Sequence, residues 1–251
     1  MKTLRRVTRL LLFLGHVLWG VLLTAIFAGV LRMSVTQPFY QGLVQAWLRR
    51  LTRIMGVRVK VSGTPASAGA LLVANHITWL DIPLLGGVLP VRFLSKQEVR
   101  HWPVVGWLAV KAGTLFITRG KAGAAAAATA TMTDALQGGA TVLLFPEGTT
   151  TTGNDVLPFH ARLFAPAINL DIPVQPIVLR YPGVNGLTQP LIPYVDDQAL
   201  WDNLWGVLGE SECAAEIHFL PPLIITGLDR KGLATLCETN IRQLIEKSSK
   251  V

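Results

Sequence analysis

The chain is poor in charge and in cysteine. Only 15% of its 251 residues are charged, against roughly 25% in typical globular proteins, and 51% are hydrophobic. The two cysteines, Cys213 and Cys237, form no C-x-x-C pair, so neither a disulfide framework nor a cysteine metal site is indicated. We therefore predict no metal and no cofactor, and a reduced, cytosolic setting is the simpler interpretation.

Acidic residues are scarcer than basic ones. The net charge is +8 and the pI is near 9.9, which predicts an anionic partner. No basic stripe interleaved with aromatics is present, so we expect no nucleic acid. The apolar composition favours an anionic membrane surface instead. The length suits one α/β domain with an appendage.

The appendage is predicted at the N-terminus. Four basic residues precede the apolar segment 10–31, which would be about 33 Å long as a helix and could span a bilayer. A secretory signal peptide is the alternative, but its apolar core is about 7–15 residues long and ends at a small-residue cleavage site. In 38–56, apolar residues recur at spacings of three and four, so this segment predicts an amphipathic helix that is either interfacial or core-facing.

Residues 1–56 are thus predicted to form membrane-anchoring helices, and residues 57–251 an α/β domain. Basic residues are equally dense on both flanks of the apolar segment, so the positive-inside rule does not orient it. This balance fits a helical hairpin that dips into one leaflet.

The rest of the chain alternates between two patterns. Short apolar or alternating runs predict strands at 57–61, 70–74, 91–95, 114–118, 141–145, 174–179 and 216–220. Helical patterns lie at 79–88, 97–110, 122–136, 161–169, 198–208 and 233–247. The alternation predicts an α/β fold, with a mixed, partly parallel sheet flanked by helices and an N-terminal hydrophobic helical hairpin as membrane anchor.

Polar residues interrupt very apolar sequence at a strand-to-helix turn. Asn75 ends an apolar strand, His76 follows in the loop, and Asp81 lies near the start of the next helix. In that arrangement Asp81 can hold the imidazole in one tautomer and leave its other nitrogen free as a base. A histidine that merely caps the helix is the alternative.

A second polar group follows another strand. Phe145, Pro146, Glu147, Gly148 and Thr149 come at the end of an apolar run, and open α/β sheets bind ligands at the carboxyl ends of their strands. A polar turn is the alternative. Lys96 and Arg119 also follow predicted strands, where cations suit a phosphate; solvated surface charges are the alternative.

Together these stretches resemble the lysophospholipid acyltransferase family, which includes the 1-acylglycerol-3-phosphate acyltransferases. Four blocks match in order over about residues 57–180. They are the His–x4–Asp block with Asn75, His76 and Asp81, a second from Lys96 to Arg119, Phe145 to Thr149, and the proline-bearing strand 172–177. The N-terminal apolar hairpin is also similar to the family's membrane anchor.

The resemblance implies roles for these residues. His76 is the general base and Asp81 orients it; Glu147, Gly148 and Thr149 belong to the acceptor site. Lys96 and Arg119 contact an anionic headgroup or the thioester carrier. Asn75, Phe145 and Pro146 support the motifs.

The implied activity is O-acylation in phospholipid biosynthesis. A fatty-acyl chain passes from acyl-CoA or acyl carrier protein to the free hydroxyl of 1-acylglycerol-3-phosphate, at the cytoplasmic face of a bacterial inner membrane. Many relatives acting on that acceptor carry an arginine where this chain has Thr150, so O-acylation of lyso-ornithine lipid or another lysophospholipid is the alternative. A hydrolase using the same His–Asp pair and a non-catalytic membrane protein are further alternatives.

Overall fold

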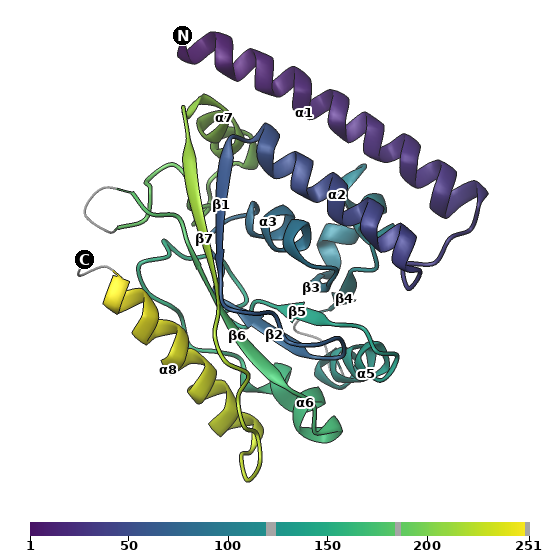
Figure 1. Cartoon of the computed structure of the whole chain (residues 1–251), viewed down its shortest axis with the longest axis vertical. Helices are drawn as coiled ribbons and strands as arrows, with labels where there is room; N and C mark the ends of the chain where they lie inside the picture. Colours follow the sequence, from purple (N-terminus) through teal and green to yellow (C-terminus); the bar gives the residue numbers. More distant parts are fainter. Residues whose placement is uncertain (119–123, 184–186, 249–251) are drawn as a thin grey trace.

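A seven-stranded sheet forms the centre of the protein. The computed structural model describes residues 1–118, 124–183 and 187–248, and the strands run in the order β1-β7-β6-β2-β5-β3-β4 (Figure 1). Their bounds are β1 Val57–Ser62, β2 Leu71–Ala74, β3 Arg92–Lys96, β4 Leu115–Ile117, β5 Val142–Leu144, β6 Val174–Arg180 and β7 Cys213–Phe219. All neighbouring pairs are parallel except β6 with β7. The predicted mixed, partly parallel α/β sheet is confirmed.

Helices cover both faces of this sheet. Their bounds are α1 Lys2–Thr24, α2 Pro38–Ile54, α3 Asp81–Val88, α4 Val105–Lys111, α5 Ala124–Gln137, α6 Ala165–Leu170, α7 Leu200–Gly209 and α8 Arg230–Ser248. Three shorter helical segments are the π-helix η1 Ala25–Val30 and the 3-10 turns η2 Gln97–His101 and η3 Ala161–Phe164. The predicted helix 122–136 begins outside the described residues, and its described part is α5.

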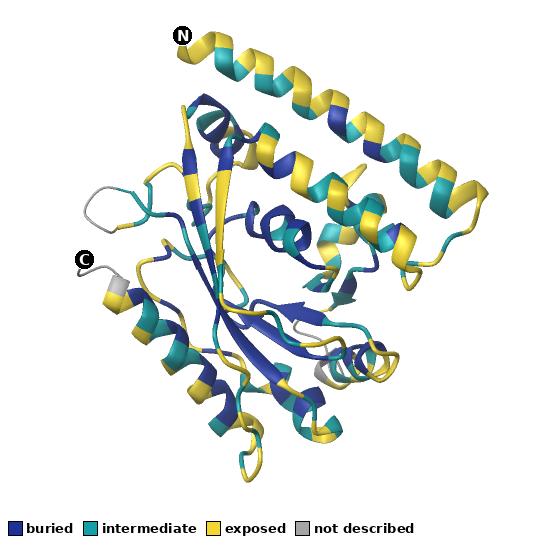
Figure 2. Cartoon of the chain, viewed as in Figure 1, coloured by how far each residue is buried: buried dark blue, intermediate teal, exposed yellow. Residues whose placement is uncertain are grey.

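The sheet separates two apolar cores (Figure 2). One core joins the sheet to α3 and α7 through residues such as Leu84, Leu85 and Val207. The other joins it to α5, α6 and α8, with Met132 and Ile241 among its members. Strands β2 and β5 are buried throughout. Parallel strands that are covered on both faces have continuous apolar sequences. The apolar runs in the sequence therefore predicted these strands.

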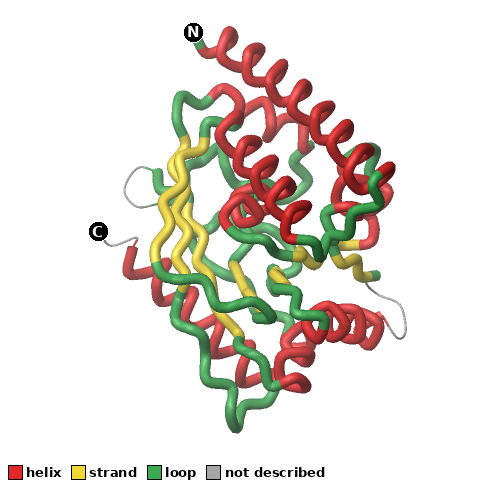
Figure 3. Tube along the Cα trace, turned by 45° about the vertical axis from the view of Figure 1, so that its right-hand side comes forward, coloured by secondary structure: helices red, strands yellow, loops and turns green. Residues whose placement is uncertain are grey.

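The predicted N-terminal helical hairpin is present. Helix α1 continues into η1, and residues 2–30 are long and apolar enough to cross a membrane, with little of that surface buried. Helix α2 runs beside α1 in both views (Figure 1 and Figure 3). His16 stacks on Trp47, the indole Nε1 donates to the carbonyl of His16, and His16 Nε2 lies 2.9 Å from the carbonyl of Trp47.

The hairpin is docked onto the α/β domain. Arg5 Nε donates to the carbonyl of Gly209 at 3.0 Å, and Arg9 donates to the carbonyl of Glu210, so cations of α1 meet the carboxyl end of α7. These hydrogen bonds satisfy carbonyl groups that the C-terminal end of a helix leaves without a backbone partner. The positive charges also complement the negative end of the α7 dipole. Helix α2 packs on α3, where its Arg49 backbone approaches Gly87. The domain boundary at residue 56 stays a prediction.

The predicted single helix 97–110 is wrong. The chain forms η2, then a turn at 102–104, then α4. Pro103 lacks a backbone N–H and restricts the residue before it, which breaks a helix at this point. Val104 has a φ of 61°, which no α-helical residue adopts. Likewise, the predicted helix 161–169 begins as η3, and β7 starts at Cys213, three residues before the predicted strand.

Candidate active site

His76 and Asp81 meet at the carboxyl end of the sheet. His76 lies in the loop after β2, and Asp81 is the first residue of α3. The imidazole Nδ1 is 2.8 Å from Asp81 Oδ2. Because a carboxylate accepts hydrogen bonds, Nδ1 carries the proton and Nε2 is the basic nitrogen. The His76 side chain is 19% exposed, and no described residue hydrogen-bonds to its Nε2, so this nitrogen is available to a substrate.

Four donors hold the Asp81 carboxylate. The same Oδ2 also accepts the backbone N–H groups of Ile77 at 2.7 Å and Thr78 at 3.0 Å. The hydroxyl of Tyr181 donates to Oδ1 at 2.7 Å. Asp81 is fully buried, and a buried charge is tolerated only where it is hydrogen-bonded in this way. The contacts therefore fix both the carboxylate and the imidazole that it orients.

Asn75 ties β2 to β6 below the histidine. Its Nδ2 donates to the carbonyl of Leu179 at 3.0 Å, and its Oδ1 accepts the N–H of Leu179 at 2.8 Å. The side chain thus replaces a strand partner where β2 ends. Asn75 is fully buried. Its part in the motif is to hold the loop of His76 to the sheet.

Glu147 is buried beneath the same loop. Its Oε1 accepts the N–H of His76 at 2.7 Å, and its Oε2 accepts the N–H of Leu157 at 2.8 Å. Burial raises the pKa of Glu147 from 4.5 to about 7, although both amide hydrogen bonds lower it. The structure thus places Glu147 against the backbone of the loop that carries His76, with only 5% of its surface exposed.

The residues around Glu147 shape the wall of the site. The ring of Phe145 stacks on His76, with centroids 4.0 Å apart. Pro146 is buried, and its carbonyl accepts the N–H of His160. Gly148 adopts a φ of +75°, a conformation that glycine adopts without strain. Thr149 is exposed.

The predicted cations are placed differently. Lys96 is the last residue of β3 and is exposed, at the same edge of the sheet as His76. Among the described residues no hydrogen bond or ion pair joins Lys96 to the His76 site. Arg119 lies outside the described residues. At Thr150, the position that the sequence analysis singled out, the hydroxyl donates to the carbonyl of Tyr194 and is turned into the protein.

Tyr181 was not predicted as a site residue. It directly follows β6, which is parallel to β2, so both strands end at the same edge of the sheet. The rule that located His76 and Glu147, a polar residue after a strand, would have found it. Burial and the neighbouring Asp81 raise the pKa of Tyr181. Its hydroxyl therefore stays protonated and remains a donor.

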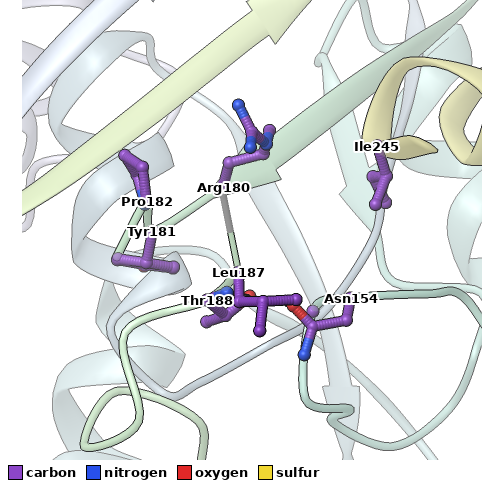
Figure 4. Close-up of a pocket in the computed structure, with 8 residues that line it drawn as sticks. Asn154, Arg180, Tyr181, Pro182, Leu187, Thr188 and Ile245 are labelled. Atoms are coloured by element: carbon purple, nitrogen blue, oxygen red, sulfur yellow. Dashed lines mark hydrogen bonds between the residues drawn. The ribbon is translucent and has the colours of Figure 1, made fainter. Parts of the chain in front are cut away.

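A small hollow lies next to the backbone of Tyr181. It has no room for a water molecule and is lined by Gly153, Asn154, Arg180, Tyr181, Pro182, Leu187, Thr188 and Ile245 (Figure 4). These residues come from β6, α8 and two loops. Neither His76 nor Asp81 lines the hollow, so the hollow is separate from these two residues.

The described residues do not form a cluster of metal ligands. Within the described residues, no group of three or more His, Cys, Asp or Glu side chains could hold a metal ion. His76 has a carboxylate on one nitrogen and a free second nitrogen, which is the arrangement of a general base.

Comparison with known proteins decides the family. The acyltransferase family model matches residues 58–180. The chain is 41% identical to the lyso-ornithine lipid O-acyltransferase of Pseudomonas aeruginosa, over 82% of this chain and 79% of that protein. The chain belongs to the acyltransferase family. The resemblance predicted from the four sequence blocks is thereby confirmed.

Other relatives carry two different activities in their names. The lyso-ornithine lipid O-acyltransferase of Brucella abortus is 33% identical over 94% of this chain and 96% of its own length. The 1-acyl-sn-glycerol-3-phosphate acyltransferase of Neisseria gonorrhoeae is 33% identical over 70% of this chain and 69% of its own.

A solved structure shares the fold of this acyltransferase. The crystal structure of the 1-acyl-sn-glycerophosphate acyltransferase from Thermotoga maritima superposes with a TM-score of 0.66, at 22% identity, and covers 97% of both chains. The similarity therefore extends beyond the α/β domain to the N-terminal helices.

Proposed function

We propose that this chain transfers a fatty-acyl group from an acyl thioester to the free hydroxyl of a lysolipid, with His76 as general base. The observation that carries this proposal is the 2.8 Å contact between His76 Nδ1 and the buried Asp81 carboxylate. The contact leaves Nε2 as the basic nitrogen at a partly exposed position. Family membership supports the reaction class, and the geometry of His76 supports its role as the base.

The reaction proceeds at Nε2 of His76. This nitrogen takes the proton of the acceptor hydroxyl as its oxygen attacks the carbonyl carbon of the thioester. A carbon–oxygen bond forms, the carbon–sulfur bond breaks, and the imidazolium returns its proton to the departing thiolate. Because a thiol has a pKa near 8.5, the leaving group needs little further assistance. The thioester is a co-substrate, and the proposed reaction requires no other cofactor.

The neighbouring residues have two kinds of role in this proposal. Glu147 and Asn75 hold the backbone on either side of His76, since their polar atoms are used by backbone groups. Glu147 thus acts on the acceptor site through the position of the loop. Gly148, Thr149, Lys96 and Arg119 remain proposed contacts of the lysolipid or of the thioester carrier.

Two acceptors are supported. Lysophosphatidic acid is the substrate class of the Neisseria relative and of the Thermotoga structure. Lyso-ornithine lipid is favoured by a more specific observation, since position 150 has no cation for a phosphate and its hydroxyl is bound to Tyr194. Two relatives named for lyso-ornithine lipid align over 82% and 94% of this chain, against 70% for the Neisseria gonorrhoeae relative.

The proposed site of action is a membrane surface. Residues 2–30 provide one helix apolar enough for membrane association, and this helix lies along the α/β domain in Figure 1 and Figure 3. A helix held along the domain in this way supports a hairpin seated in one leaflet. We place the active site on the cytoplasmic face of a bacterial inner membrane, where acyl-CoA or acyl carrier protein is the donor.

Acyl transfer from a labelled thioester to the two acceptors in parallel tests this proposal. We expect transfer to at least one acceptor, and a loss of about a hundred- to ten-thousandfold in His76→Ala, the range for removal of a general base. Transfer that survives in His76→Ala would overturn the mechanism. Thioester loss without acylated product would identify a hydrolase, and transfer only to lyso-ornithine lipid would assign the acceptor.

A further inference from the structure

An exposed apolar surface lies beside the active site. Trp102 and Val104, in the turn before α4, are 44% and 45% exposed, and Val105, the first residue of α4, is 50% exposed. Trp107 and Val110, further along α4, are also exposed. We call these five residues the apolar ridge. Soluble proteins expose single apolar residues routinely, but a contiguous group of this kind marks an interaction surface.

The backbone presents the ridge in a strained conformation. Val104 has φ 61° and ψ −60°, and the N–H of Val105 donates to the carbonyl of Pro103 at 2.6 Å, which closes a γ-turn. This conformation is unfavourable for a β-branched residue. Gly106 fixes the turn against η2, because a Cβ there would lie 2.3 Å from the carbonyl oxygen of Arg100. Val104, the residue in this conformation, is 45% exposed.

The ridge is at the catalytic edge of the sheet. Strand β3 leads into η2 and the ridge, and it is parallel to β5, which is parallel to β2. The carboxyl ends of these three strands therefore point to the same edge, where His76 and Phe145 also lie. A lysolipid that reaches His76 passes this edge of the protein.

The ridge is continuous with the N-terminal hairpin. Helix α1 contacts α4. Val35, in the connector between α1 and α2, lies close to Gly113, which follows α4. A Cβ added at Gly113 would lie only 2.7 Å from the side chain of Val35. The exposed apolar surface of α1 and the ridge thus adjoin each other.

Basic residues flank the ridge along the chain. Residues 92–113 include Arg92, Lys96, Arg100 and Lys111, against one acidic residue, Glu98. Lys96 and Arg100 are exposed. Tryptophan beside basic residues is the composition of protein surfaces that enter the headgroup layer of an anionic membrane.

We propose that the apolar ridge is a second lipid-contacting surface, which inserts into the interfacial layer of an anionic membrane and, together with α1, seats the mouth of the His76 site on the bilayer. The claim that a lysolipid enters the site from the membrane rests on the proposed function. The claim that the ridge contacts the membrane rests only on the exposed apolar residues and the basic residues near them.

A fluorescent probe on the ridge tests the contact directly. In the test variant, Val105→Cys, the new cysteine carries a nitrobenzoxadiazole label. The control variant is Ile224→Cys, because Ile224 is also apolar and is 82% exposed. Ile224 belongs to the segment between β7 and α8, which lies at the opposite end of the molecule from α1 in Figure 1. The native cysteines are buried, which raises the pKa of Cys213 and of Cys237 to about 12, so neither competes for the label.

The probe is read with and without vesicles of phosphatidylcholine and phosphatidylglycerol. We expect the emission at position 105 to shift to shorter wavelength when the protein binds, and the emission at 224 to stay unchanged. An unchanged emission at 105 while the protein sediments with the vesicles would overturn the proposal, because the ridge would then remain in water.

Activity distinguishes a role at the interface from local damage. We expect Val105→Asp to lower transfer to a long-chain lysolipid in vesicles by about tenfold, the effect of about 1.4 kcal/mol, and Ile224→Asp to have no effect. Transfer to a short-chain lysolipid dissolved as monomers should stay within about twofold. Equal losses with both substrates would overturn the ridge's role. Absence of transfer by the unmodified protein would refute the proposed function. The probe at position 105 would still show whether the ridge contacts the membrane.

Discussion

The hydroxyl of Tyr181 donates a 2.7 Å hydrogen bond to Oδ1 of Asp81, although the two residues are 100 positions apart in the chain. Both residues are essentially excluded from solvent. Among the described residues no hydrogen bond joins Tyr181 to His76, so in the proposed mechanism Tyr181 acts through Asp81, as a positioning residue.

Removal of this hydroxyl should therefore impair turnover and not binding. We expect Tyr181→Phe to lower kcat by about tenfold or more, because a hydrogen bond to a charged group is worth about 1.5–3 kcal/mol, with KM unchanged. The Nδ1 proton resonance of His76 should also move in the NMR spectrum. Tyr40→Phe is the matched control, since Tyr40 is equally buried and bonds to Thr24. A loss confined to KM, or an unmoved resonance, would contradict the assignment.

Glu147 should make the stability of the protein depend on pH. Its pKa rises from 4.5 to about 7 on folding, so the folded state binds more protons than the unfolded state between these values. The free energy of unfolding must then fall as pH rises from about 4.5 to 7, by about 3 kcal/mol at most. Denaturant unfolding in detergent at pH 5 and pH 8 measures this difference.

Glu147→Gln removes the titrating group and should remove most of that difference. The amide can still accept the N–H of His76, but it loses one acceptor, so we expect the variant to be less stable at pH 5 and closer to the unmodified protein at pH 8. An identical pH dependence in both proteins would show that Glu147 is not its source.

Asn75 should matter for stability as well as for rate. Asn75→Ala leaves the N–H and the carbonyl of Leu179 buried without their side-chain partner, at a cost of about 1–3 kcal/mol for each group. Asn154 is a matched control because it also bonds to a backbone N–H, that of Thr188, but is exposed. Thermal unfolding should show a clear decrease for Asn75→Ala and little change for Asn154→Ala.

The hairpin depends on a close approach at Gly20. A Cβ there would lie 2.5 Å from the indole of Trp47, whereas a Cβ at Gly15 would meet nothing within 4 Å. We expect Gly20→Ala to separate α1 from α2, and Gly15→Ala to stabilise α1 by up to about 1 kcal/mol. Distances between spin labels on the two helices would report the separation. Equal behaviour of the two variants would argue against the packing of Trp47 on α1.

Sequence patterns located the elements well and their junctions less well. The apolar runs at β2 and β5 were recognised because parallel strands are buried on both faces. The helix predicted at 97–110 failed because periodicity continues across Pro103, whereas the backbone cannot. Arg5 and Arg9 looked like residues flanking a membrane segment. Only the tertiary structure shows that they bind the end of α7.

The sequence by itself indicated the family and proposed His76 and Asp81 as the catalytic pair, because the two residues are close in the chain and local geometry brings them together. It could not show that Tyr181, Asn75 and Glu147 support that pair, since those contacts join different strands and loops across the sheet. It also could not show that the hydroxyl of Thr150 bonds to the carbonyl of Tyr194 or that Val104 adopts a positive φ. Which polar atoms remain free for a substrate is decided by packing between distant segments, and that is a property of the folded chain.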